Sequence, residues 1–119
     1  MVDEMTKEKI KEAYISKDKN KMAEEIFKLL DWKFTLRIWW IHDNKEKKIF
    51  DFLRKKKRTS MLVLDNNLMY SVEALIMDRD FFKKYLSELF FPEKYNYDFE
   101  DSEKKIEITH DGDVKIRKE

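Results

Sequence analysis

The stretch that decides the fold reads Trp32-Lys33-Phe34-Thr35-Leu36-Arg37-Ile38-Trp39-Trp40-Ile41. Large apolar residues at the even positions alternate with mostly polar residues at the odd ones. This period of two predicts a β-strand over 32–41 with one strongly buried face. We expect Trp40, on the apolar side, to be nearly inaccessible. Because Trp39 and Ile41 place apolar groups on the other side as well, we expect this strand to be central in its sheet.

Hydrophobic periodicity predicts alternating helices and strands after this strand. The predicted elements are a helix at 43–57, strands at 60–64 and 68–77, a helix at 79–91 and a strand at 95–99. Asp43 with Glu46 forms a variant of the capping box, Asp78 is the expected cap of the next helix, and Pro92 ends that helix. Residues 68–77 fit a helix as well as a strand. We prefer the strand, because a short turn after 60–64 closes a hairpin easily.

Both ends of the chain add further elements. Residues 4–16 and 20–31 have the apolar spacing of two short amphipathic helices, the second with Asn20 as its N-cap. Near the C-terminus, two alternating runs flank Asp111-Gly112, a pair that favours a tight hairpin turn. We therefore predict a hairpin over 104–117 with Gly112 at a positive φ angle.

This element order predicts an α+β fold. After two N-terminal helices, it reads as a ferredoxin-like β-α-β-β-α-β unit followed by a C-terminal β-hairpin. We predict a single domain over 1–119, with 1–31 as a helical extension and 32–119 as the α+β core. The extension is expected to cover the sheet face that carries Trp39. A winged-helix-like arrangement with 104–117 as the wing is the alternative, although it offers no natural place for the strand at 32–41.

Composition narrows the class of protein. The 119 residues are 42% hydrophobic and 14% aromatic, which is enough for one substantial core. Cysteine is absent, the longest apolar runs are too short to span a bilayer, and the N-terminus lacks a secretory signal. We therefore expect a cytoplasmic protein without a membrane partner. The abundance of Lys and Glu is typical of thermophile proteins and also of AT-rich genomes.

A basic segment is the most polarised part of the chain. The formal net charge is only +1, so a global field does not draw the protein to nucleic acid. The candidate nucleic-acid contacts are nevertheless concentrated here: Lys47, Lys48, Arg54, Lys55, Lys56, Lys57 and Arg58. Arg37 and Trp39 would add a cation and a stacking surface. Alternatively, these cations only complement the C-terminal end of a helix. We expect the acidic residues at 98–103 to lie away from this segment.

A second candidate surface is aromatic. It consists of Phe91, Tyr95, Tyr97 and Phe99, the last three of which alternate with amide and acidic residues. Such alternation is typical both of a core strand and of an edge strand that binds a partner protein. The sequence leaves both interpretations open.

Signals for catalysis are weak. His42 and His110 are the only histidines, and we expect both to be exposed at element ends. Several late residues faintly resemble the acids and lysine of metal-dependent nucleases, namely Asp98, Glu100, Asp101, Glu103, Asp113 and Lys115. Their spacing does not match that motif. A single Gly leaves no Gly-rich phosphate loop, so we expect no cofactor and no metal.

The sequence therefore favours a non-catalytic binding protein: an adaptor, regulator or inhibitor of a larger macromolecule, with another protein as the expected partner. Nucleic-acid binding through the basic segment is the first alternative, and a small metal-dependent nuclease is the second. A short chain without recognisable motifs is also typical of viral or mobile-element proteins.

Overall fold

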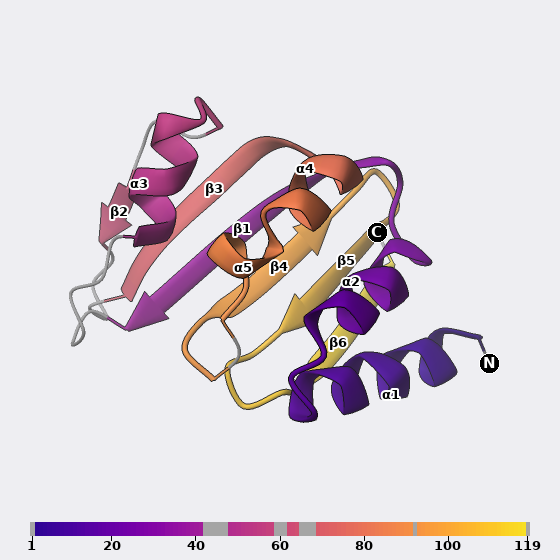
Figure 1. Cartoon of the computed structure of the whole chain (residues 1–119). Coiled ribbons are helices and arrows are strands. Elements are labelled where there is room, and N and C mark those ends of the chain that lie inside the picture. The colour runs from indigo at the N-terminus through magenta and orange to yellow at the C-terminus, as the bar shows by residue number, and fades with distance from the viewer. Residues whose placement is uncertain (1, 42–47, 59–61, 65–68, 92, 119) are drawn as a thin grey trace.

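The structure is a computed structural model that describes residues 2–41, 48–58, 62–64, 69–91 and 93–118. Its elements follow in the order α1 (Val2–Ile15), α2 (Lys19–Phe27), β1 (Lys33–Ile41), α3 (Lys48–Lys55), β2 (Leu62–Leu64), β3 (Met69–Asp78), α4 (Arg79–Lys84), α5 (Leu86–Leu89), β4 (Asn96–Glu100), β5 (Lys104–Ile108) and β6 (Val114–Lys118) (Figure 1). The fold is a small α+β domain, as predicted, and the described part of the ambiguous segment at 68–77 is a strand, β3.

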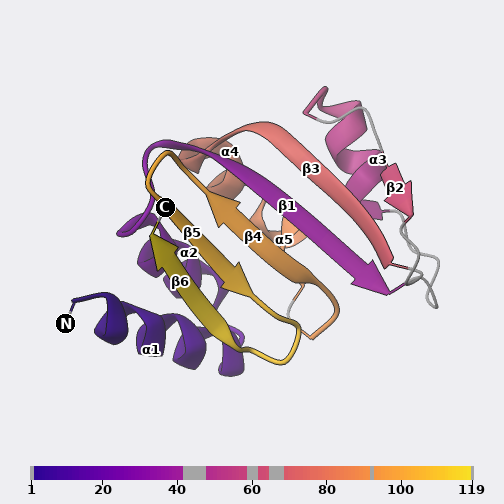
Figure 2. The same ribbon diagram turned by 180° about the vertical axis from the view of Figure 1, so that it is seen from behind.

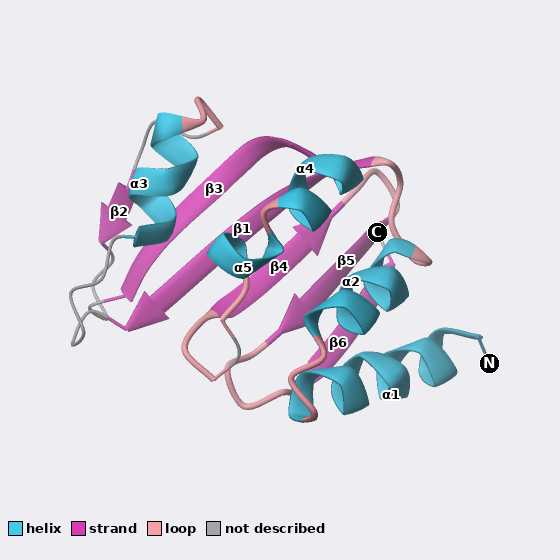
Figure 3. Cartoon of the chain, viewed as in Figure 1, coloured by secondary structure: helices cyan, strands magenta, loops and turns pink. Residues whose placement is uncertain are grey.

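The described strands form one antiparallel sheet in the order β2-β3-β1-β4-β5-β6 (Figure 3). β1 lies in the interior of the sheet, paired with β3 on one side and β4 on the other. Its even-numbered residues turn into the core, where Trp40 is only 1% exposed. The predictions of a central strand and of a buried Trp40 are therefore confirmed.

The ferredoxin-like layout is not confirmed. The sheet continues past β4 with β5 and β6, so its strand order differs from that of a four-stranded ferredoxin-like unit. The C-terminal hairpin is therefore an integral extension of the sheet. The interior position of β1 also leaves no room for the winged-helix alternative, which lacks such a strand.

The five helices of the described residues all cover the same face of the sheet. Figure 1 shows them in front of the strands, and Figure 2, from behind, shows the strands unobstructed. We expected helices 4–16 and 20–31 to cover the face that carries Trp39, and that prediction is wrong. The apolar stripe of α1 and α2, with Ile10 and Ile26, instead joins the single core formed with Leu36 and Ile38. Covering the polar face would have desolvated its charged side chains.

The helix boundaries differ in detail from those expected. The N-cap of α2 is Asp18, whose carboxylate accepts a hydrogen bond from the Lys21 N–H at 3.1 Å, and not Asn20. Asp78 caps α4 as predicted, accepting from the Phe81 N–H at 2.7 Å. The helix expected over 79–91 is divided at Tyr85, which turns the next helix so that its apolar residues enter the core.

The remaining expectations about helix ends fall partly outside the described residues. The helix expected at 43–57 is observed as α3, and its predicted cap, Asp43 with Glu46, lies outside the described residues, as does Pro92.

None of the described helices combines the length and the apolar character that crossing a bilayer requires.

Tyr14 joins the N-terminal helix to two later parts of the chain. Its hydroxyl donates to the carbonyl oxygen of His110 at 2.6 Å and accepts from the N–H of Glu93 at 2.5 Å. The Tyr14 ring also lies against the turn between β5 and β6, where Gly112 has a φ angle of 91°. The predicted hairpin with Gly112 at positive φ is confirmed. The turn is closed by the Gly112 N–H, which donates to the carbonyl of Thr109 at 2.9 Å.

Candidate functional site

One face of the sheet carries no helix within the described part of the chain, and we call it the uncovered sheet face (Figure 2). Side chains alternate along each strand, so the residues between core positions point to this face. Strand pairing shows that they include Lys33, Thr35, Arg37, Trp39, Met69, Ser71, Glu73, Asn96, Asp98, Glu100, Lys105, Glu107, Lys115 and Arg117. Five of these are basic and four are acidic, so the face is nearly neutral.

The charges of this face pair with one another across the strands. Arg37 donates to the carboxylate of Glu73 at 2.5 Å, and this hydrogen bond raises the pKa of Arg37 despite the opposing effect of burial. Lys105 lies 3.5 Å from the Asp98 carboxylate, and Arg117 lies 3.6 Å from that of Glu107. A pair at exposed positions, such as Arg37–Glu73, contributes at most about 1 kcal/mol to stability. The main consequence of these pairs is a patterned surface with little excess charge.

Trp39 borders a depression of about 240 Å³ on this face, which we call the Trp39 depression. Its lining consists of Arg37, Trp39, Met69, Ser71 and Asp98, contributed by three adjacent strands. The Trp39 ring is half-buried, so part of its apolar surface is presented to solvent. Aromatic residues, Met and Arg, three of the residue types in this lining, are enriched in protein–protein interfaces.

Asp98 is the unusual member of this lining. The residue is only 6% exposed, and its Oδ1 has no hydrogen-bond partner among the described residues. Burial raises the pKa of Asp98, and the neighbouring charge of Lys105 lowers it by less. The charge of Lys105 therefore offsets only part of the cost of burying ionised Asp98.

Because the folded pKa of Asp98 is raised, its protonated form favours the fold. That contribution is present below the ordinary aspartate pKa and is lost as the pH rises through the folded value. We expect Asp98→Asn to gain melting temperature relative to the natural chain by a few degrees more at pH 7 than at pH 3. Melting curves followed by circular dichroism measure this, and Glu103→Gln, at an exposed carboxylate, is the matched control. An Asp98→Asn gap that shrinks toward pH 7 would show that Lys105 dominates.

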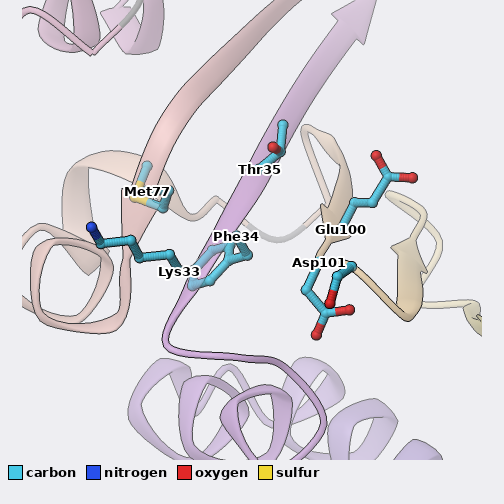
Figure 4. Close-up of a pocket in the computed structure, with 7 residues that line it drawn as sticks. Lys33, Phe34, Thr35, Met77, Glu100 and Asp101 are labelled. Carbon is cyan, nitrogen blue, oxygen red and sulfur yellow. The ribbon is translucent and has the colours of Figure 1, made fainter.

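A second depression, of about 490 Å³, lies at the other end of β1 and is lined by Lys33, Phe34, Thr35, Met77, Glu100, Asp101 and Ser102. In Figure 4 the Lys33 ammonium and the carboxylates of Glu100 and Asp101 lie on opposite sides of Phe34. Burial tends to raise the pKa of Asp101, but the N–H groups of Glu103, Asp31 and Lys104 donate to its carboxylate and lower the pKa overall. Asp101 thus organises a turn.

The late acidic residues do not converge on a metal site. Within the described residues no three His, Cys, Asp or Glu side chains form such a group. Asp98 pairs with Lys105, Asp101 holds its turn, and Asp113 is exposed in the β5–β6 loop. The nuclease hypothesis gains no support from this arrangement. Of the two histidines, His110 is exposed beside Asn96 and Asp111, and His42 lies outside the described residues.

Three of the four aromatic residues proposed as an edge surface are core residues. Tyr95, Tyr97 and Phe99 are at most 2% exposed, and β4 lies between β1 and β5 and not at an edge. Phe91 is half-buried against the same core. The edge-strand interpretation is therefore wrong for these tyrosines and for Phe99. The β5–β6 hairpin extends the sheet beyond β4, so β4 is not an edge strand.

The basic segment lies on the helical side of the molecule, so it does not join Arg37 and Trp39. Lys48, Arg54, Lys55, Lys56 and Lys57 are exposed, Arg58 is half-buried, and Lys47 lies outside the described residues. The structure adds neighbours that the sequence did not indicate: Lys84 and Tyr85, at the end of α4. A basic pair followed by Tyr, at 83–85, is the local signal that could have suggested them.

Comparison with known proteins does not extend this description. The chain matches no protein-family model, and neither the curated proteins nor the solved structures contain one with significant similarity to it.

Proposed function

We propose that the protein is a non-catalytic binding protein, an adaptor, regulator or inhibitor that recognises another protein with its uncovered sheet face. The observation that carries this proposal is the placement of the five described helices on one side, which leaves Trp39 accessible on the other. Trp is among the residues that contribute most to protein–protein affinity. The Trp39 depression offers a place for a partner side chain beside this ring.

The charge pattern supports a protein partner over a nucleic acid for this face. A surface that binds phosphates needs an excess of unpaired cations. Here Arg37 is hydrogen-bonded to Glu73, and the acids of β4 and β5 lie among the basic residues. Mixed, mutually paired charges instead favour a partner with a complementary pattern of both signs, which sets specificity and register.

The test is capture of a partner from the native host, followed by reconstitution with that purified partner. We expect Trp39→Ala to weaken binding at least tenfold, because truncating a central aromatic anchor typically costs about 2 kcal/mol or more. Trp32→Ala is the matched control, since Trp32 is 52% exposed and precedes the sheet.

Hydrogen exchange of the reconstituted complex locates the contact. Protection in β1, β3 and β4, with binding retained by Trp32→Ala, would support the proposal. Equal affinity of Trp39→Ala and the natural chain, or protection confined to the helices, would refute it.

A further inference from the structure

A second surface of different chemistry lies on the helical side of the molecule. The end of α3 and the end of α4 meet at a depression of about 420 Å³, which we call the α3–α4 depression. It is lined by Lys56, Arg58, Asp78, Asp80, Phe81, Lys84 and Tyr85. Three of these residues are basic: Lys56 and Arg58 follow α3, and Lys84 comes from the distant end of α4.

A cluster of aromatic rings holds these two segments together. Phe52 of α3 lies 5.1 Å from Tyr85 and 6.3 Å from Phe81, and Phe81 lies 4.9 Å from Tyr85, measured between ring centroids. Ring pairs of this kind contribute about 0.5–1.5 kcal/mol each beyond their burial. The relative position of α3 and α4 is therefore fixed by packing.

The same rings position the cations. The Lys56 and Lys84 ammonium groups lie 4.8 Å and 5.4 Å from the Tyr85 ring centroid, and the Arg58 guanidinium lies 4.5 Å from that of Phe81. Cation–π contacts hold a charge in place without neutralising it. Within the described part of the chain, neither Lys56 nor Lys84 forms an ion pair with an acidic side chain. These two charges are thus available to an anion.

The two acidic residues in the lining do not offset this field fully. The lining carries three basic side chains against the carboxylates of Asp78 and Asp80, so an excess of positive charge remains, and one oxygen of Asp78 is occupied as the N-cap of α4. The Tyr85 hydroxyl responds to the field: its hydrogen bond with Lys56 and the charge of Lys84 lower its pKa. The acidic segment at 98–103 has its described partners in β5 and in the loop before β1, away from these cations.

We propose that the α3–α4 depression binds the phosphate groups of a nucleic-acid strand. Phosphate oxygens suit ammonium and guanidinium donors, and the Tyr85 hydroxyl adds a further hydrogen-bond donor. A polyanion fits better than a small free anion, because exposed Arg54, Lys55 and Lys57, next to Lys56 in the chain, add further positive charge. This binding activity is independent of the protein partner proposed for the uncovered sheet face.

The test measures the affinity of the full chain for a fluorescein-labelled oligo(dT) between about 50 and 200 mM salt, by fluorescence anisotropy. We expect the triple variant Lys56→Ala, Arg58→Ala, Lys84→Ala to lose at least tenfold in affinity at the lowest salt. Its slope of log affinity against log salt should flatten by about two, since each single-strand phosphate contact contributes roughly 0.7.

Two variants control for loss of fold and for non-specific charge. The triple variant Lys9→Ala, Lys11→Ala, Lys21→Ala removes the same net charge from exposed positions on α1 and α2, and should bind like the natural chain. Tyr85→Phe keeps the ring cluster and removes only the hydroxyl, so it should weaken binding by a few-fold without a change in melting temperature.

Competitors decide the ligand class. Inorganic phosphate at the same phosphate concentration should displace the oligonucleotide poorly, and polyglutamate should not displace it. Displacement by inorganic phosphate would reassign the depression to a small oxyanion, and displacement by polyglutamate would reassign it to acidic chains in general. No binding of oligo(dT) at low salt, or equal losses in the two triple variants, would overturn the proposal. None of these outcomes bears on the partner of the uncovered sheet face.

Discussion

Replacing Trp40 with alanine is expected to lower the free energy of unfolding by about 3–5 kcal/mol, which is a large part of the stability of a domain of this size. The side chain is 1% exposed on the central strand and contacts two further rings, with centroid distances of 5.7 Å to Tyr70 and 5.4 Å to Tyr95. β1 joins the two halves of the sheet, so a cavity at this point cannot be filled by the movement of one loop. Urea unfolding followed by far-ultraviolet circular dichroism measures the loss.

Trp32→Ala and Trp40→Phe control the interpretation. The first removes the same side chain from a position that is 52% exposed, and should cost less than about 1 kcal/mol. The second keeps an aromatic ring and removes Nε1, which has no hydrogen-bond partner among the described residues, so part of the loss should be recovered. Equal costs for Trp32→Ala and Trp40→Ala would show that β1 does not lie in the register described.

Gly112→Val is the second substitution with a large expected effect, on the order of 2–5 kcal/mol of destabilisation. With φ at 91°, the position is in the left-handed region, where a β-branched residue is strained. A Cβ here would also lie 3.0 Å from Cδ1 of Tyr14, whose hydroxyl donates one hydrogen bond and accepts another and so holds the ring in place. Neither the turn nor the ring can therefore yield without losing contacts.

The same denaturation experiment tests this substitution. Asp113→Val introduces the same side chain one residue later, at an exposed position, and should change stability by less than about 1 kcal/mol. If Gly112→Val is as stable as Asp113→Val, the close approach of Tyr14 to the turn is contradicted.

Local patterns predicted most of the elements. The alternation at 32–41 and the Asp111-Gly112 pair are complete within a few residues, so each specifies its structure without reference to the rest of the chain. The choice of strand at 68–77 was also correct, because hairpin closure is a local matter. The N-cap of α2 was misplaced by two residues, since Asp18 and Asn20 are both good caps and only the backbone geometry distinguishes them.

Long-range arrangement was predicted less well. α1 and α2 cover the apolar face of the sheet. Which face is apolar depends on all the strands together, so the sequence of one helix cannot predict it. Tyr95, Tyr97 and Phe99 were ambiguous because a core strand and an exposed edge strand show the same alternation; only the pairing of β5 with β4 distinguishes them. Lys56 lies near Lys84 and Tyr85 because two helices pack against each other. The basic segment in the sequence therefore predicted Lys56 but neither Lys84 nor Tyr85.

The hydrogen bonds of the Tyr14 hydroxyl with His110 and Glu93 have a consequence for folding during synthesis on the ribosome. Tyr14 is made before its hydrogen-bond partner His110, which follows 96 residues later. At a synthesis rate of about 5–20 residues per second, that interval lasts roughly 5–20 s. During this interval α1 can pack against α2, but its contacts with β6 and its hydrogen bond to His110 form only after those residues have been made. Of the described elements, α1 is made before the others, yet it reaches its final position only after the β5–β6 hairpin has been made.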